Sequence, residues 1–138
     1  MFTSCRNNGF RMTFETGWTI SVRWSRTCYC ERRSWDIECS PSDCDTELVY
    51  SKDAEIAAWY GDKKGHGSTI DGICETWLEI HEHDQVEGWV STNDVAGWIA
   101  KVAAFKGDHK LESERLRLEE RINQWSKQDD QCTTQDDH

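Results

Sequence analysis

Apolar and polar side chains alternate from residue 10 to residue 15 and again from residue 18 to residue 24. The alternation runs on both sides of Thr16-Gly17, a short turn sequence, and therefore predicts an antiparallel hairpin. One face of this hairpin is apolar and is expected to build a core. The opposite face carries Arg11 and Arg23, and we expect it to be open to a ligand.

Further strands are predicted after the hairpin, where short runs are rich in apolar and aromatic residues or alternate again. These runs are 46–50, 54–60, 73–83 and 86–90, although the alanines of 54–60 are also compatible with a helix. A long loop, 25–44, separates the hairpin from the first of them, and a glycine-rich loop occupies 61–72. Residues 1–9 lack a pattern and are expected to form a loose leader.

Helical spacing replaces the alternation after residue 90. Ser91, with Asp94 three residues later, resembles a capping box and predicts the start of a helix. Gly107 predicts its end in a left-handed conformation. The apolar positions of this helix are Val95, Trp98, Ile99, Val102 and Phe105. A second helix is predicted over about 110–126, with a stripe of Leu111, Leu118, Ile122 and Trp125.

These elements predict the α+β fold class: an antiparallel sheet, made of the hairpin and two to three further strands, followed by two C-terminal helices. Residues 1–126 are expected to form a single domain, since the length suits one modest core. Residues 127–138 have no apolar pattern and are expected to be a disordered acidic tail.

Charge is unevenly distributed along the chain, whose net charge is −10. Residues 1–33 hold six arginines against Glu15 and Glu31, while the other 105 residues hold ten basic and 24 acidic side chains. Most of the surface would therefore repel the phosphates of duplex nucleic acid. A small anionic ligand held near the arginines, or a basic protein partner on the acidic part, remains compatible with this distribution.

Seven cysteines occur in a chain that shows neither a secretion signal nor an apolar run long enough to span a membrane. A cytoplasmic location and reduced thiols are therefore expected. Cys28, Cys30, Cys39 and Cys44 could hold zinc, but their spacing lacks paired C-x2-C knuckles, and small buried thiols are the favoured interpretation.

The remaining chemistry-bearing patterns do not predict an enzyme. His81 and His83 would share one face of a strand, as two metal ligands do, although solvent-facing histidines are the favoured interpretation. No nucleophile signature or phosphate-binding glycine motif is present. We expect no catalytic residue, no metal and no cofactor.

Aromatic residues close to arginines form the best candidate for a ligand site. Aromatic rings stack on planar bases, whereas arginines and helix N-termini bind phosphates. Each of these tryptophans could instead be a packing residue. The aromatic members are Trp24, Tyr29, Trp89 and Trp98, and the polar members are Arg23, Arg26 and Asn93 at the predicted helix start.

Three segments in order, FETGWTISVRW with the CYC that follows at 28–30, SKDAEIAAWY at 51–60 and EGWVSTNDVAGWIAKVAAF at 87–105, resemble a family of small, mostly phage-encoded proteins. This family comprises the Thoeris anti-defence sponges, which sequester a cyclic ADP-ribose immune signal. The resemblance implies an α+β oligomer that binds such a signal without cleaving it. By position, it implies stacking by Trp24 and Trp89, polar contacts from Asn93, and phosphate contacts from Arg115 or Arg121. The Cys-rich loop 31–46 and the insert 70–84 depart from the family pattern.

The expected function is therefore a non-catalytic phage anti-defence protein in the host cytoplasm. It would sequester a cyclic ADP-ribose isomer or a cyclic oligonucleotide. The alternative is an acidic inhibitor that mimics nucleic acid and binds a host or CRISPR-type defence enzyme. Two apolar helix stripes exceed what one face of a small sheet can cover, so a homodimer or larger even-numbered oligomer is also expected.

Overall fold

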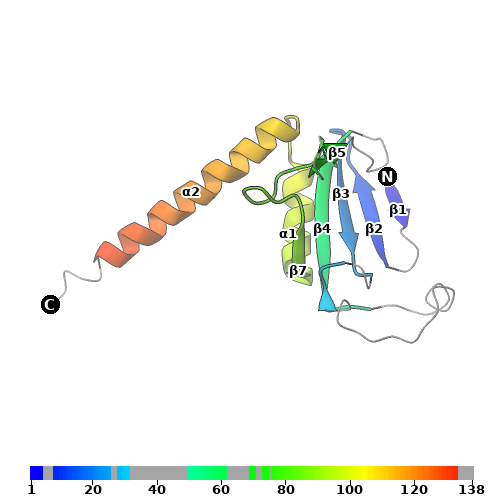
Figure 1. The fold of residues 1–138 in the computed structure, drawn as a ribbon, viewed down its shortest axis with the longest axis horizontal. Coiled ribbons are helices and arrows are strands. Elements are labelled where there is room, and N and C mark those ends of the chain that lie inside the picture. Colours follow the sequence, from blue (N-terminus) through cyan, green and yellow to red (C-terminus); the bar gives the residue numbers. More distant parts are fainter. Residues whose placement is uncertain are drawn as a thin grey trace.

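The computed structural model describes residues 1–4, 8–25, 28–31, 50–61, 69–70, 73–74 and 76–133, with the backbone alone at 69–70, 73–74 and 132–133. A five-stranded antiparallel sheet in the order β1-β2-β3-β4-β7 is followed by helices α1 and α2 (Figure 1), which confirms the α+β prediction. The sheet strands are β1 (Phe2–Ser4), β2 (Gly9–Thr13), β3 (Trp18–Arg23), β4 (Asp53–Tyr60) and β7 (Glu87–Ser91). A separate pair is formed by β5 (Thr69–Ile70) and β6 (Ile73–Cys74), and the helices are α1 (Thr92–Ala103) and α2 (His109–Thr133).

The predicted hairpin is confirmed as β2 and β3, with Met12 opposite Ile20. Its apolar face lies in the core as expected. Its other face is less open than predicted, because Thr19 and Ser21 are buried and the Arg11 guanidinium lies over the Trp59 ring at 5.3 Å. Thr19 and Ser21 are on β3, between Arg11 on β2 and Trp59 on β4. The contact between Arg11 and Trp59 therefore covers these two small side chains.

Two strand predictions were wrong. The expected loose leader contains β1, which pairs with β2 and places Phe2 opposite Met12. Within the predicted strand 73–83, the described residues form only the short strand β6. Farther along, Leu78 N still donates to Ala58 O of β4. The next amide, Glu79 N, instead donates to Ser113 Oγ of α2, so the pairing with the sheet ends there. Segment 46–49 lies outside the described residues, and the edge strand predicted at 86–90 is confirmed as β7.

Helix α1 begins where the sequence predicts, with Ser91 Oγ accepting from Asp94 N at 3.3 Å. Its predicted end was wrong: Ala104, in a right-handed conformation, caps it before Gly107 is reached. Phe105 then turns into the core and packs against Trp18 at 4.8 Å between ring centroids, and Trp18 Nε1 donates to Gly107 O. These tertiary contacts end the helix early.

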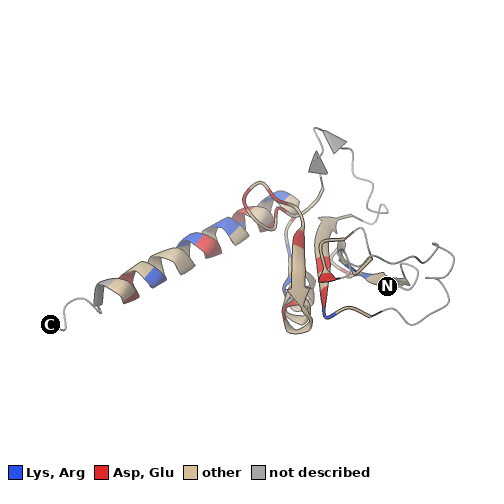
Figure 2. Ribbon diagram, turned by 60° about the horizontal axis from the view of Figure 1, so that its bottom comes forward, with Lys and Arg blue, Asp and Glu red and all other residues tan. Residues whose placement is uncertain are grey.

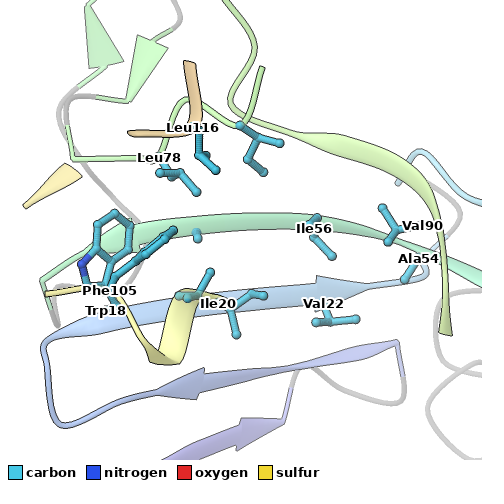
Figure 3. Close-up of a cluster of buried hydrophobic side chains, with 12 residues drawn as sticks. Trp18, Ile20, Val22, Ala54, Ile56, Leu78, Val90, Phe105 and Leu116 are labelled. Carbon is cyan, nitrogen blue, oxygen red and sulfur yellow. The ribbon is translucent and has the colours of Figure 1, made fainter. Parts of the chain in front are cut away.

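The core lies between α1 and the sheet, and Figure 3 shows its side chains. Strands β3, β4 and β7 contribute apolar residues from one face, and α1 contributes Val102. Leu78 and Leu116 close the core at the end where α2 begins. The twelve clustered residues are Trp18, Ile20, Val22, Ala54, Ile56, Ala58, Leu78, Ile80, Val90, Val102, Phe105 and Leu116.

Helix α2 has 25 residues, a length of about 37 Å, and it points away from the sheet (Figures 1 and 2). Leu116 and Glu112 are buried near its start, and Arg117 Nη2 donates to Ile80 O. The predicted helix end near residue 126 was wrong, since residues 127–133 continue the helix. No glycine or proline interrupts this polar segment.

Candidate functional site

A pocket of about 220 Å³ opens where α1 begins. Strands β2 and β3 supply its apolar wall, the residues leading into β4 cross it, and the first turn of α1 closes one side. Phe10 and Trp24 meet edge to face there, with ring centroids 6.3 Å apart. The lining residues are Phe10, Val22, Trp24, Tyr50, Ser51, Lys52, Asp53, Ala54, Val90, Thr92 and Val95.

The pocket lies beside the first turn of α1, at the edge of the core. The 12 residues of α1 span about 18 Å. Phe10 and Trp24 pack only partly against the core, so a hollow remains beside them. The crossing segment is fixed by Ser51 Oγ, which donates to Asp53 O at 2.7 Å, and by Lys52 N, which donates to Glu31 Oε2 at 2.9 Å.

The size of the pocket limits what it can hold. Sites for drug-sized ligands usually enclose about 300–1,000 Å³. At about 220 Å³, this pocket has room for one planar ring system and not for an entire dinucleotide. Its apolar walls suit such a ring, and Lys52 with the N-terminal end of α1 provides positive potential at the rim. Asp53 adds a negative charge to the same rim.

A second aromatic group, Tyr29 with Trp89, lies on the opposite face of the sheet. Their ring centroids are 5.6 Å apart, and the side chains are 45% and 59% exposed. Gly88 and Trp89 together oppose the single residue Glu55 of β4, which is a β-bulge. Trp89 has a φ of 50°, a strained value for a bulky residue. The bulge therefore holds a tryptophan ring in an exposed position.

The segment containing Tyr29 is pinned to the sheet through its backbone. Tyr29 N donates to Glu55 Oε2 at 2.7 Å, and Trp89 N donates to Tyr29 O at 2.7 Å. Glu31 N donates to Asp53 Oδ1 at 2.5 Å. Arg23 faces Glu55 in the β3–β4 register. These contacts make the Tyr29–Trp89 group a fixed surface feature.

The structure thus divides the predicted ligand residues among three places. Trp24 lines the pocket, and Asn93 lies nearby on the first turn of α1, exposed and outside the lining. Arg23, Tyr29 and Trp89 lie on the opposite face, while Arg26 is outside the described residues.

The two predicted phosphate-binding arginines lie on α2, which starts from the far end of α1. Arg115 Nη1 pairs with Glu112 Oε1 at 3.2 Å, and Arg121 is exposed. Helix α2 extends away from the sheet (Figure 1), and neither arginine is among the residues that line the pocket. Their predicted role requires another copy of the chain or another ligand position.

The metal candidates are not assembled within the described residues, where no group of three or more His, Cys, Asp or Glu side chains could hold an ion. Cys28 and Cys30 are buried, with Cys28 Sγ 3.0 Å from Ser25 Oγ, whereas Cys39 and Cys44 fall outside the described part. The predicted shared face of the two histidines was wrong because a turn replaces the strand: His81 and Asp84 exchange backbone hydrogen bonds.

Of the eleven lining residues, the sequence analysis named only Trp24 as a ligand contact, and the side chains it missed include Phe10, Tyr50 and Lys52. Phe10 is on the predicted apolar face, so its position beside Trp24 could have been inferred from the hairpin register. Tyr50 and Lys52 precede β4, and no local pattern indicates that this segment crosses the N-terminal end of a helix 40 residues later.

Charge along α2 is mixed (Figure 2). Lys101 of α1 pairs with Glu119 at 3.1 Å, and Arg117 Nη2 lies 3.3 Å from Glu120 Oε1. Basic and acidic groups therefore neutralise one another on this helix, which does not offer the single-sign surface that a nucleic-acid mimic would use.

Within the described residues, no helix is both long and apolar enough to cross a membrane. Comparisons of the chain with protein-family models, with curated proteins and with solved structures found no match.

Proposed function

We propose that this chain binds a small, planar, negatively charged ligand and holds it without transforming it. The main support for this proposal is the pocket beside Trp24. Its volume of about 220 Å³ and its aromatic wall suit one purine-sized ring. The ring would lie against Trp24 and Phe10. Phosphate groups would then be outside the hollow, near Lys52 and the N-terminal end of α1.

The ligand class follows from the apolar hollow and from the positive groups at its rim, Lys52 and the N-terminal end of α1, which lie beside the negative charge of Asp53. A nucleotide-derived signal combines a planar base with phosphates. The resemblance to Thoeris anti-defence sponges supports a cyclic ADP-ribose isomer or a cyclic oligonucleotide, sequestered for a phage in the host cytoplasm. A sponge must compete with a signalling receptor, so nanomolar affinity, about −12 kcal/mol, is expected.

Isothermal titration of the full chain with cyclic ADP-ribose isomers and cyclic di- and trinucleotides tests the proposal. We expect binding by one member of this panel, and heat release should return that ligand unchanged. Absence of binding across the panel would overturn the nucleotide proposal. Recovery of a cleaved product would replace the sponge by an enzyme.

Two tryptophan variants decide which aromatic group forms the site. Base stacking contributes about 1–3 kcal/mol, so Trp24→Ala should weaken binding about 5- to 150-fold. Trp89→Ala removes an aromatic ring of the same size from the opposite face and should leave affinity unchanged. The reverse pattern would move the site to the Tyr29–Trp89 surface. Near-ultraviolet circular dichroism of both variants checks that the fold is retained.

A further inference from the structure

Most of the large apolar side chains of α2 lie outside the core cluster of the described residues. Beyond Arg117 the helix continues for 16 residues away from the sheet (Figure 1). Four large apolar side chains on it are exposed, and Trp125, the largest, is 67% accessible. Together with Leu111, Leu118 and Ile122 it forms what we call the α2 stripe. Exposed apolar surface of this extent usually marks a partner site.

The spacing of the α2 stripe is that of a two-helix interface. Leu111, Leu118, Ile122 and Trp125 are separated by seven, four and three residues, which are heptad intervals. At 100° per residue they lie within about 60° of one another around the helix axis. Leu116, which anchors α2 in the core, lies more than 90° from this line. The stripe is therefore directed away from the chain's own domain.

Charged residues on the same line distinguish between the two possible orientations of a helix pair. Arg115 is seven residues before Ile122, and Asp129 is seven residues after it. A parallel pair would bring each of these charges beside the identical charge of the second copy. An antiparallel pair centred on Ile122 instead brings Arg115 beside Asp129 of the partner subunit, twice by symmetry.

The position of Ile122 within α2 supports the same arrangement. It lies one residue from the midpoint of His109–Thr133, so antiparallel copies centred there overlap along almost the whole helix. Trp125 of each copy would then lie close to Leu118 of the partner subunit. We propose that α2 is a dimerisation arm, which pairs antiparallel with α2 of a second copy of this chain. This inference does not depend on the proposed ligand.

Light scattering coupled to size-exclusion chromatography at tens of micromolar tests the pairing. The expected mass is twice the 16.1 kDa of one chain. Ile122→Glu should weaken the dimer at least 100-fold, while Gln124→Glu, which adds the same charge away from the stripe, should leave it intact. Ile122 is 58% exposed, so its replacement does not threaten the fold, and circular dichroism should show unchanged helix content.

Orientation is tested by Asp129→Arg. In the antiparallel pair this change faces Arg115 with a second positive charge and should weaken the dimer about tenfold at low salt. In a parallel pair it would only exchange one like-charge contact for another. A monomeric wild-type chain, a dimer that survives Ile122→Glu, or a dimer unaffected by Asp129→Arg would each overturn the proposal. A wild-type monomer would leave the stripe to a different protein.

Discussion

Glu112 fixes the start of α2, and its replacement gives the sharpest test of how the helix is attached. Its side chain is 1% exposed, and Oε1 accepts from Lys106 N at 3.2 Å, Gly107 N at 2.9 Å and Arg115 Nη1 at 3.2 Å. Glu112→Leu keeps the apolar volume but leaves two amides of the α1–α2 turn without their acceptor.

The expected cost follows from these two amides. A hydrogen bond to a charged acceptor is worth about 1.5–3 kcal/mol, and the gain from no longer burying a carboxylate offsets part of the loss. Arg115 is 53% exposed, so its ion pair adds little. We expect Glu112→Leu to lower the free energy of unfolding by about 2–3 kcal/mol.

Urea unfolding followed by tryptophan fluorescence measures this change, provided that the m-value is constant. Glu112→Gln is the matched control, because an amide oxygen at the same position can accept from both turn amides. Its cost should stay below about 1 kcal/mol. Equal losses for the two variants would refute the reasoning, since they would show that the charge of Glu112 matters and its acceptor role does not.

Four further substitutions concern the sheet and α1, each measured by the same unfolding assay. Gly88→Ala would place Cβ 2.4 Å from Tyr29 Cβ and should cost about 1–3 kcal/mol, whereas Gly97→Ala, with nothing within 4 Å, should stabilise α1 by about 0.5–1 kcal/mol. Trp18→Phe removes a fully buried indole and its hydrogen bond to a carbonyl of the α1–α2 turn, and should cost about 2–4 kcal/mol. Ser91→Ala removes the N-cap of α1 and should cost about 1 kcal/mol. A stabilising Gly88→Ala would contradict the observed docking of segment 28–31.

Elements governed by local interactions were predictable from the sequence. The hairpin follows from strict alternation around a turn, and the start of α1 follows from the Ser91 hydroxyl and the amide three residues later. Elements governed by distant contacts were not. The alternation of 73–83 resembles a strand, yet after Leu78 the segment leaves β4, and Glu79 N bonds to Ser113 Oγ of α2, 34 residues away.

The placement of the candidate ligand residues on two opposite faces of the sheet was partly predictable. Trp24 and Arg23 are neighbours in the sequence, but successive side chains of a strand point to opposite faces. A single site that contains both Trp24 and Arg23 is therefore incompatible with the hairpin that the alternating pattern predicted. The contribution of Lys52 could not have been inferred, because it depends on where α1 begins relative to β4.

The pocket and the α2 stripe lie toward opposite ends of α1, and this separation has a consequence for both proposals. Trp24 lies beside the first turn of α1, whereas α2 leaves after its last turn, about 18 Å along the helix axis. Ile122→Glu should therefore leave ligand affinity unchanged, and Trp24→Ala should leave the dimer intact. A ligand affinity that falls when the dimer dissociates would instead indicate that the partner subunit completes the site, as the predicted phosphate contacts of Arg115 or Arg121 require.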